Sequence, residues 1–143
     1  MSMSLPAALT PVLSGREAII DALYRCVSAF ADDAVFDLNG TIMDGIDAIN
    51  AQCFASISKM DTTHYLTNIR INILDGSKAE VTCTALAQHY HGGEGMKAGA
   101  IPLLAGSFYW VDLVRDAGDG LWKVKKWKLK TSWGQGDWGV FKN

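Results

Sequence analysis

The stretch TTHYLTNIRIN at residues 62–72 decides the fold, because the hydrophobic pattern changes there from helical spacing to alternation. Within it, isoleucines alternate with polar residues, as expected for a strand with one buried face. The same stretch carries His64 where the strand begins. We predict strands from here nearly to the C-terminus, with helices and connecting loops before it.

Three further strands are predicted downstream, each bounded by turn residues. The Asp-Gly-Ser triplet at 75–77 predicts a hairpin, after which a strand runs over about 78–91. Later strands are expected at 104–115 and 121–133, separated by a turn rich in Asp and Gly. The glycine-rich segment at 92–102 is expected to be a mobile loop.

The N-terminal half predicts two helices around a short extended piece. Residues 1–13 are rich in Ser, Pro and Ala and are expected to form a flexible arm. A capping box at 14–17 starts a helix whose apolar residues recur at helical spacing as far as Phe30. Residues 34–40 predict a short β-like piece entering a turn, and a second helix is expected over about 46–60. Two helices followed by an antiparallel meander define the α+β class.

Composition restricts the classes of function. The 143 residues fit one domain with a sizeable core, which we place at 14–143. A formal net charge of −2 without a basic run argues against nucleic-acid binding, and no apolar run is long enough to span a bilayer. Three cysteines without a Cys-x-x-Cys pattern, and a start unlike a secretory signal, favour reduced thiols in a cytoplasmic protein.

The candidate catalytic groups are the three histidines, His64, His89 and His91. Imidazole can take and return a proton near neutral pH, which enolisation or elimination requires. His89 and His91 lie on one face at the end of the second strand, and we expect the fold to bring one of them to His64 in one pocket. His-x-His is also a common start of a zinc site, but without Cys or Glu in a tight motif we expect no metal.

Five other side chains are candidates for contact with a substrate. Asp37 and Asn39 flank an apolar strand piece and either point into the cavity or form a turn. Tyr24, on the first helix, is a candidate phenol for the pocket. Tyr65 and Trp133 either stack on an aromatic substrate or belong to the core.

Three tryptophans in the last two predicted strands favour self-association of the protein. Trp110, Trp122 and Trp127 indicate an apolar sheet face that needs a partner, which favours a homodimer. The tail at 134–143 is expected to fold back over either the pocket or that partner.

Several segments together resemble a known family. The segments ADDAVFDLNG at 31–40, THYLTN at 63–68, GLWKV at 120–124 and WGQGDW at 133–138 resemble the SnoaL-like group of the nuclear transport factor 2-like superfamily. Within it, the chain is most similar to scytalone dehydratase and to fungal SnoaL-like isomerases of polyketide and xanthone pathways. The resemblance covers about residues 15–141.

The resemblance implies a cone-shaped α+β barrel, with N-terminal helices packed on a curved antiparallel sheet. It implies chemistry without a cofactor on cyclic, often polyketide-derived substrates. His64 matches the first of the two dehydratase histidines that exchange protons, and the second falls at either His89 or His91. Ser107 and Tyr109 match positions that line the dehydratase pocket.

One segment departs from the family pattern. Members carry an aspartate-rich turn and a short helix after the first helix, whereas residues 26–28 here lead directly into the next segment. In the family, the missing piece would carry a catalytic aspartate. Its absence here favours isomerisation over dehydration. A short connection also favours exchange of the first helix between the protomers of a dimer.

The sequence therefore predicts an isomerase or lyase that moves a proton on a cyclic polyketide-derived intermediate. His64 would remove or return the proton, and His89 or His91 would polarise an oxygen or protonate a leaving hydroxyl. Two alternatives stay open: a non-catalytic module for small-molecule binding or dimerisation, and an accessory subunit of a ring-hydroxylating oxygenase.

Overall fold

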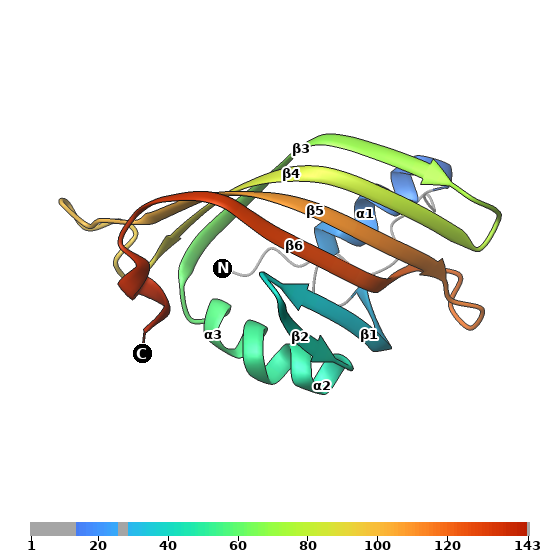
Figure 1. Ribbon diagram of the computed structural model, residues 1–143, viewed down its shortest axis with the longest axis horizontal. Coiled ribbons are helices and arrows are strands. Elements are labelled where there is room, and N and C mark those ends of the chain that lie inside the picture. The colour runs from blue at the N-terminus through green and yellow to red at the C-terminus, as the bar shows by residue number, and fades with distance from the viewer. Residues whose placement is uncertain (1–13, 26–28, 143) are drawn as a thin grey trace.

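A computed structural model describes residues 14–25 and 29–142, with only the backbone for Tyr24 and Arg25. The predicted arm at 1–13 lies outside the described residues. The described strands form one curved six-stranded sheet in the order β2-β1-β6-β5-β4-β3, with helices along one side (Figure 1). The predicted α+β class with helices on a curved sheet is confirmed.

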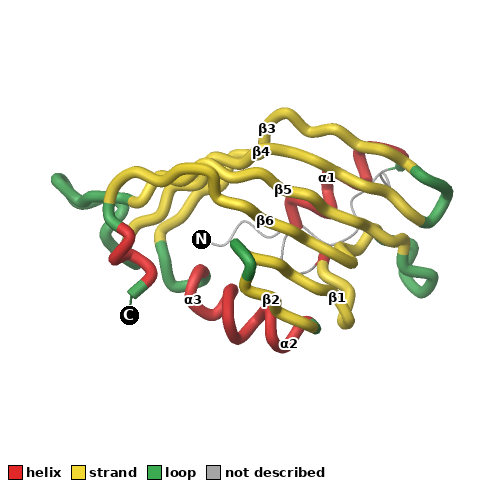
Figure 2. The backbone as a smooth tube through the Cα atoms, viewed as in Figure 1, coloured by secondary structure: helices red, strands yellow, loops and turns green. Residues whose placement is uncertain are grey.

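The elements follow one another in a simple order, with the helical pieces early and the long strands late (Figure 2). Their bounds are α1 Gly15–Arg25, β1 Phe30–Leu38, β2 Thr41–Asp44, α2 Ile46–Ile49, η2 Asn50–Phe54, α3 Ala55–Ile57, β3 Asp61–Ile73, β4 Lys78–Tyr90, β5 Leu103–Arg115, β6 Trp122–Gly136 and η3 Trp138–Phe141.

The first strand corrects the sequence-based prediction. The helix was expected to reach Phe30, but Phe30 is the first residue of β1, and β1 pairs with β6 in parallel, in contrast to the antiparallel pairing elsewhere in the sheet. Phe30 stacks on Trp127 with ring centroids 5.6 Å apart and planes 8° apart. A strand beside β6 buries this ring as well as a helix would. The apolar spacing alone therefore could not decide between helix and strand at Phe30.

The helices cover one face of the sheet, which we call the inner face. Its buried side chains on β4 and β5 include Val81, Cys83, Val111 and Leu113. Ile19, Ala22 and Leu23 of α1 are buried in the same core. Trp122 and Trp127 also belong to this core, each with 7% of its surface exposed, so Trp110 alone of the three late tryptophans is exposed.

A β-bulge in β3 decides which face its side chains occupy. Two residues, Asn68 and Ile69, stand opposite the single residue Cys83, because the pairing passes from Thr67–Thr84 directly to Arg70–Thr82. Asn68 has a left-handed φ of 52°, and its side-chain amide donates to Thr84 Oγ1 at 3.0 Å. The extra residue reverses the alternation, so His64 shares the inner face with Ile71 rather than the outer face with Arg70.

Candidate active site

Two imidazoles meet on the inner face, at the end of the sheet where β3 begins and β4 ends. The ring centroids of His64 and His89 lie 5.1 Å apart, with planes at 76°. The register explains the contact, since His64 pairs with Ala87 and His89 is the next residue of β4 on that face. The predicted convergence of His64 and His89 is therefore present in the structure.

The surroundings of His89 hold its ring in place. Only 5% of the residue is exposed. Its Nδ1 lies 2.8 Å from Thr62 Oγ1, and Phe141 packs against the ring with centroids 5.1 Å apart. The tail therefore does fold back over the histidines, through η3, and this expectation is confirmed.

Both imidazoles are weaker bases here than a free histidine. Burial, and secondly the nearby charge of a protonated His64, lower the pKa of His89 to about 4. Burial also lowers the pKa of His64, although part of that side chain stays exposed to solvent. Both rings are therefore mostly neutral near pH 7.

The lowered pKa of His89 predicts a loss of stability in acid. An unfolded histidine binds a proton near pH 6.5, so between that value and about 4 the unfolded chain binds more protons than the folded one. Stability then falls as pH falls, by about 2 kcal/mol between pH 7 and 5. Urea unfolding at both pH values measures this change, and His89→Gln should remove most of it. An equal pH dependence in both proteins would show that His89 is not held neutral.

Short side chains separate the histidines from polar groups on later strands. These residues, all on the inner face by register, are Ala85, Ala87, Ala105, Gly134 and Gly136. Beyond them, Ser107 Oγ donates to Thr131 Oγ1 at 3.3 Å, and Asn39 binds Thr131 through a 2.7 Å bond to its amide and a 3.1 Å bond to its hydroxyl. This end of the inner face thus combines two imidazoles, small residues and a chain of hydrogen-bonding groups.

Ser107 and Tyr109 have different surroundings, although both lie on the inner face. Ser107 is 9% exposed and belongs to the polar chain. Tyr109 lies in the aromatic core, edge-on to Trp127 with centroids 5.1 Å apart, and its register partner Cys83 is six residues from His89 along β4. Ser107 therefore stays in the candidate site, and Tyr109 is placed in the core.

Four other sequence candidates lie away from the imidazole pair. Tyr65 and Trp133 are exposed on the outer face, where the Trp133 indole covers Gly106. Asp37 also faces outward, and its carboxylate accepts the amide of Gly40 at 2.8 Å, which is the turn interaction left open above. His91 is exposed, one residue beyond the end of β4. These placements correct the expectation that they share a pocket with His64.

Asn39 and Tyr24 are the remaining side chains that the sequence predicted to contact a substrate. Asn39 occupies the turn after β1 with a φ of 54°, so its backbone serves the turn while its side chain joins the polar chain. The Tyr24 side chain lies outside the described residues.

Sequence reasoning missed Thr62 and the contacts made by the loop at 92–102. The carboxylate of Asp61 accepts the amide of Gly95 at 2.8 Å, and such backbone bonds lower the pKa of Asp61. Gly92 packs so closely on the carbonyl of Lys59 that an added Cβ would lie 2.1 Å from it. These contacts attach the first residues of the loop to the segment that leads into β3.

Two features are absent from the described ranges 14–25 and 29–142. These ranges contain no group of three His, Cys, Asp or Glu side chains placed to hold a metal ion. None of their helices is long and apolar enough to cross a membrane.

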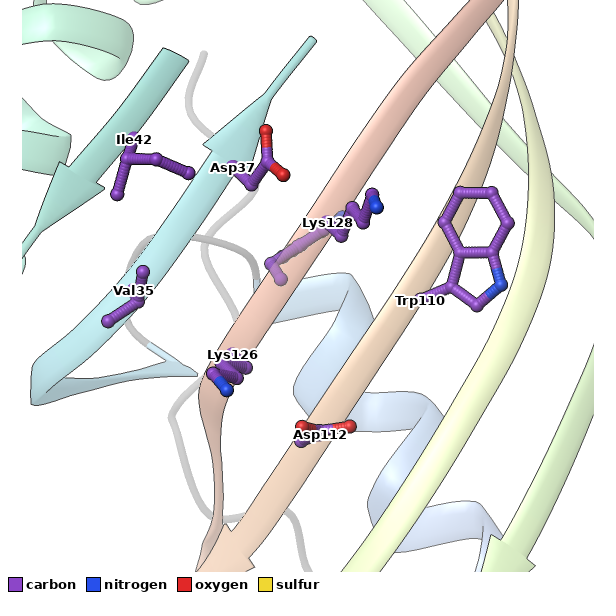
Figure 3. Close-up of a pocket in the computed structure, with 8 residues that line it drawn as sticks. Val35, Asp37, Ile42, Trp110, Asp112, Lys126 and Lys128 are labelled. Carbon is purple, nitrogen blue, oxygen red and sulfur yellow. The ribbon is translucent and has the colours of Figure 1, made fainter. Parts of the chain in front are cut away.

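The outer face carries a shallow hollow that the sequence did not indicate. Figure 3 shows it between β1, β6 and β5, with Lys128 lying between Asp37 and Trp110. Lys128 Nζ is 6.0 Å from the centre of the Trp110 ring. The hollow contains none of the three histidines, so it is separate from the imidazole site.

The fold and the imidazole pair define a small α+β protein with a potential acid–base site on the inner face of a curved sheet. A family model described as a SnoaL-like domain matches residues 11–128, and the chain belongs to this family. It is 59% identical over 150 residues to the terrestric acid biosynthesis cluster protein E of Penicillium crustosum, covering 96% of each chain.

Solved structures share the fold at low sequence identity. A candidate scytalone dehydratase from Novosphingobium aromaticivorans has a TM-score of 0.67 and 21% identity, over 84% of this chain and 83% of that one. The type 3 hexachlorocyclohexane dehydrochlorinase of Novosphingobium barchaimii has a TM-score of 0.65 and 21% identity, over 87% and 90%. These likenesses confirm the nuclear transport factor 2-like fold.

Proposed function

We propose that this SnoaL-like protein is a cofactor-independent isomerase or lyase that moves a proton on a cyclic, polyketide-derived metabolite. The observation that carries the proposal is the contact of two imidazoles, with ring centroids 5.1 Å apart, on the inner face. The relative named for a terrestric acid biosynthesis cluster supports a place in secondary metabolism. The names of the structural neighbours, a dehydratase and a dehydrochlorinase, agree with elimination or a related proton transfer.

His64 is the general base in this proposal. His64 is the more exposed of the two rings. Once it is protonated, its charge opposes protonation of the buried His89, whose pKa is about 4. The proton removed from carbon therefore goes to His64, which returns it to another position or to a leaving group. His89 binds an oxygen of the substrate, and Ser107 with Asn39 helps to hold the ring.

The proposal can be tested by complementation in Penicillium crustosum, the organism of the 59% identical relative. A Penicillium crustosum strain that lacks the 59% identical relative is complemented with this chain, and its metabolites are compared by mass spectrometry. We expect the compound that accumulates in the deletion strain to be consumed. Incubated with purified protein in D2O, that compound should also gain deuterium. Binding without consumption or exchange would favour the binding-module alternative, and copurification with an iron–sulfur oxygenase would favour the accessory-subunit alternative.

We also propose that the protein forms a homodimer through its outer face. The face exposes large apolar side chains, which are Ile42, Tyr65, Leu86, Phe108, Trp110 and Trp133. The hollow beside Trp110 is lined by residues of both signs, so two copies related by a two-fold axis can place lysines of one beside aspartates of the other. Exchange of α1 between protomers remains a further prediction.

Trp110→Asp is expected to weaken dimerisation by about 30-fold or more, because a central tryptophan of an interface typically contributes about 2 kcal/mol or more. Sedimentation equilibrium measures the dissociation constant. Met96→Asp is the matched control, since Met96 is exposed on the loop away from the sheet face. A wild-type protein that is monomeric at all concentrations would contradict both the interface and the exchange of α1.

A further inference from the structure

We infer that Thr62 is a positioning residue that fixes the tautomer of His89, with the ring hydrogen on Nδ1 and an unprotonated Nε2 available to the substrate. The inference rests on the proposed function for its catalytic meaning. The tautomer itself is a property of the resting protein and can be measured without a substrate.

Hydrogen counting at the Thr62 hydroxyl leads to this assignment. Thr62 Oγ1 lies 2.9 Å from the carbonyl oxygen of Gln88 and 2.8 Å from Nδ1 of His89. A carbonyl oxygen has no hydrogen to give, so the single hydroxyl hydrogen of Thr62 points to Gln88. The hydrogen between Thr62 and His89 must then come from Nδ1, and a neutral ring with hydrogen on Nδ1 has none on Nε2.

The rest of the packing keeps this ring from turning over. Thr62 and His89 are direct register partners on β3 and β4, so the hydroxyl is delivered by the sheet itself. His64 lies against the ring at 76° and Phe141 at 58°, each with centroids 5.1 Å away. A flipped ring would place carbon against the Thr62 hydroxyl and lose its hydrogen bond.

The tautomer restricts the substrate. Neutral His89 accepts a hydrogen bond at Nε2 and does not donate one there, so it suits a hydroxyl or enol rather than a bare carbonyl oxygen. The predicted substrate therefore carries an O–H group close to the carbon that loses its proton to His64. This assignment replaces the expectation from sequence that His89 polarises an oxygen by donation.

Nitrogen NMR of 15N-histidine-labelled protein tests the tautomer directly at neutral pH, because protonated and unprotonated ring nitrogens give distinct two-bond correlations. We expect the hydrogen on Nδ1 in the wild type and in Thr62→Ser, which keeps the hydroxyl. Thr62→Val should shift the tautomer ratio toward Nε2–H by about tenfold, the size expected for one hydrogen bond. Thr63→Val, at the neighbouring exposed position, should leave the ratio unchanged. A wild-type His89 with hydrogen on Nε2 overturns the inference, as does an unchanged ratio in Thr62→Val.

Kinetics then separate this inference from the proposed function. With the compound from the deletion strain as substrate, Thr62→Val should raise KM by about tenfold with a smaller change in kcat, and Thr62→Ser should restore it. A protein with the Nδ1–H tautomer but no activity would refute the proposed function alone. An active protein whose His89 carries its hydrogen on Nε2 would refute the tautomer assignment alone.

Discussion

His64→Ala is expected to reduce the rate of proton transfer by about 10²- to 10⁴-fold while the protein stays folded. The loss follows because the variant removes the stronger base of the pair and leaves His89, whose pKa of about 4 makes it a weak substitute. The fold should survive because His64 is partly exposed on β3, at the edge of the sheet, and does not belong to the hydrophobic core. Deuterium exchange into the accumulated compound measures the rate, and circular dichroism measures the fold.

The other two histidines provide the comparison. His89→Gln should lower the rate strongly, whereas His91→Ala should change it by less than about twofold, since His91 is exposed beyond the end of β4. The pair also predicts a spectroscopic change: without His64, one cause that lowers the pKa of His89 is gone, so that pKa should rise. A folded His64→Ala protein with full activity would rule out the acid–base mechanism and favour a binding module.

The sequence predicted the long strands well because their signals are local. Alternation and turn residues located β3, β4, β5 and β6 to within a few residues. The predicted boundary between α1 and β1 was wrong, because Phe30 fits the apolar face of either element. Only packing against Trp127, which lies far along the chain, decides between them.

The site could be predicted in part, for the same physical reason. His64 and His89 stood out by their chemistry and by family resemblance, and the structure places them together. Thr62 escaped notice because a threonine in a strand is ordinary, and its importance comes from a partner 27 residues away. The alternating pattern alone would place His64 on the outer face with Arg70, because such a pattern does not reveal a β-bulge.

Asn68→Val is therefore expected to destabilise the protein by about 2–3 kcal/mol and to impair activity. Valine is strained at the left-handed φ of 52°, which costs about 1–2 kcal/mol, and the hydrogen bond to Thr84 is also lost. Relief of the strain would require β3 to pair without the bulge, which would turn either His64 or Ile71 to the wrong face. Urea unfolding and the exchange assay measure the two effects.

Two further variants separate backbone strain from loss of the side chain. Asn68→Gly loses the same hydrogen bond but adopts positive φ freely, so it should cost only about 1 kcal/mol and keep most activity. Deletion of Asn68 removes the extra residue itself, and the shortened strand then alternates regularly with His64 and Ile71 both on the inner face. The deletion should thus retain more activity than Asn68→Val, although it is the larger change in sequence. The opposite order would mean that the bulge does not direct His64 toward His89.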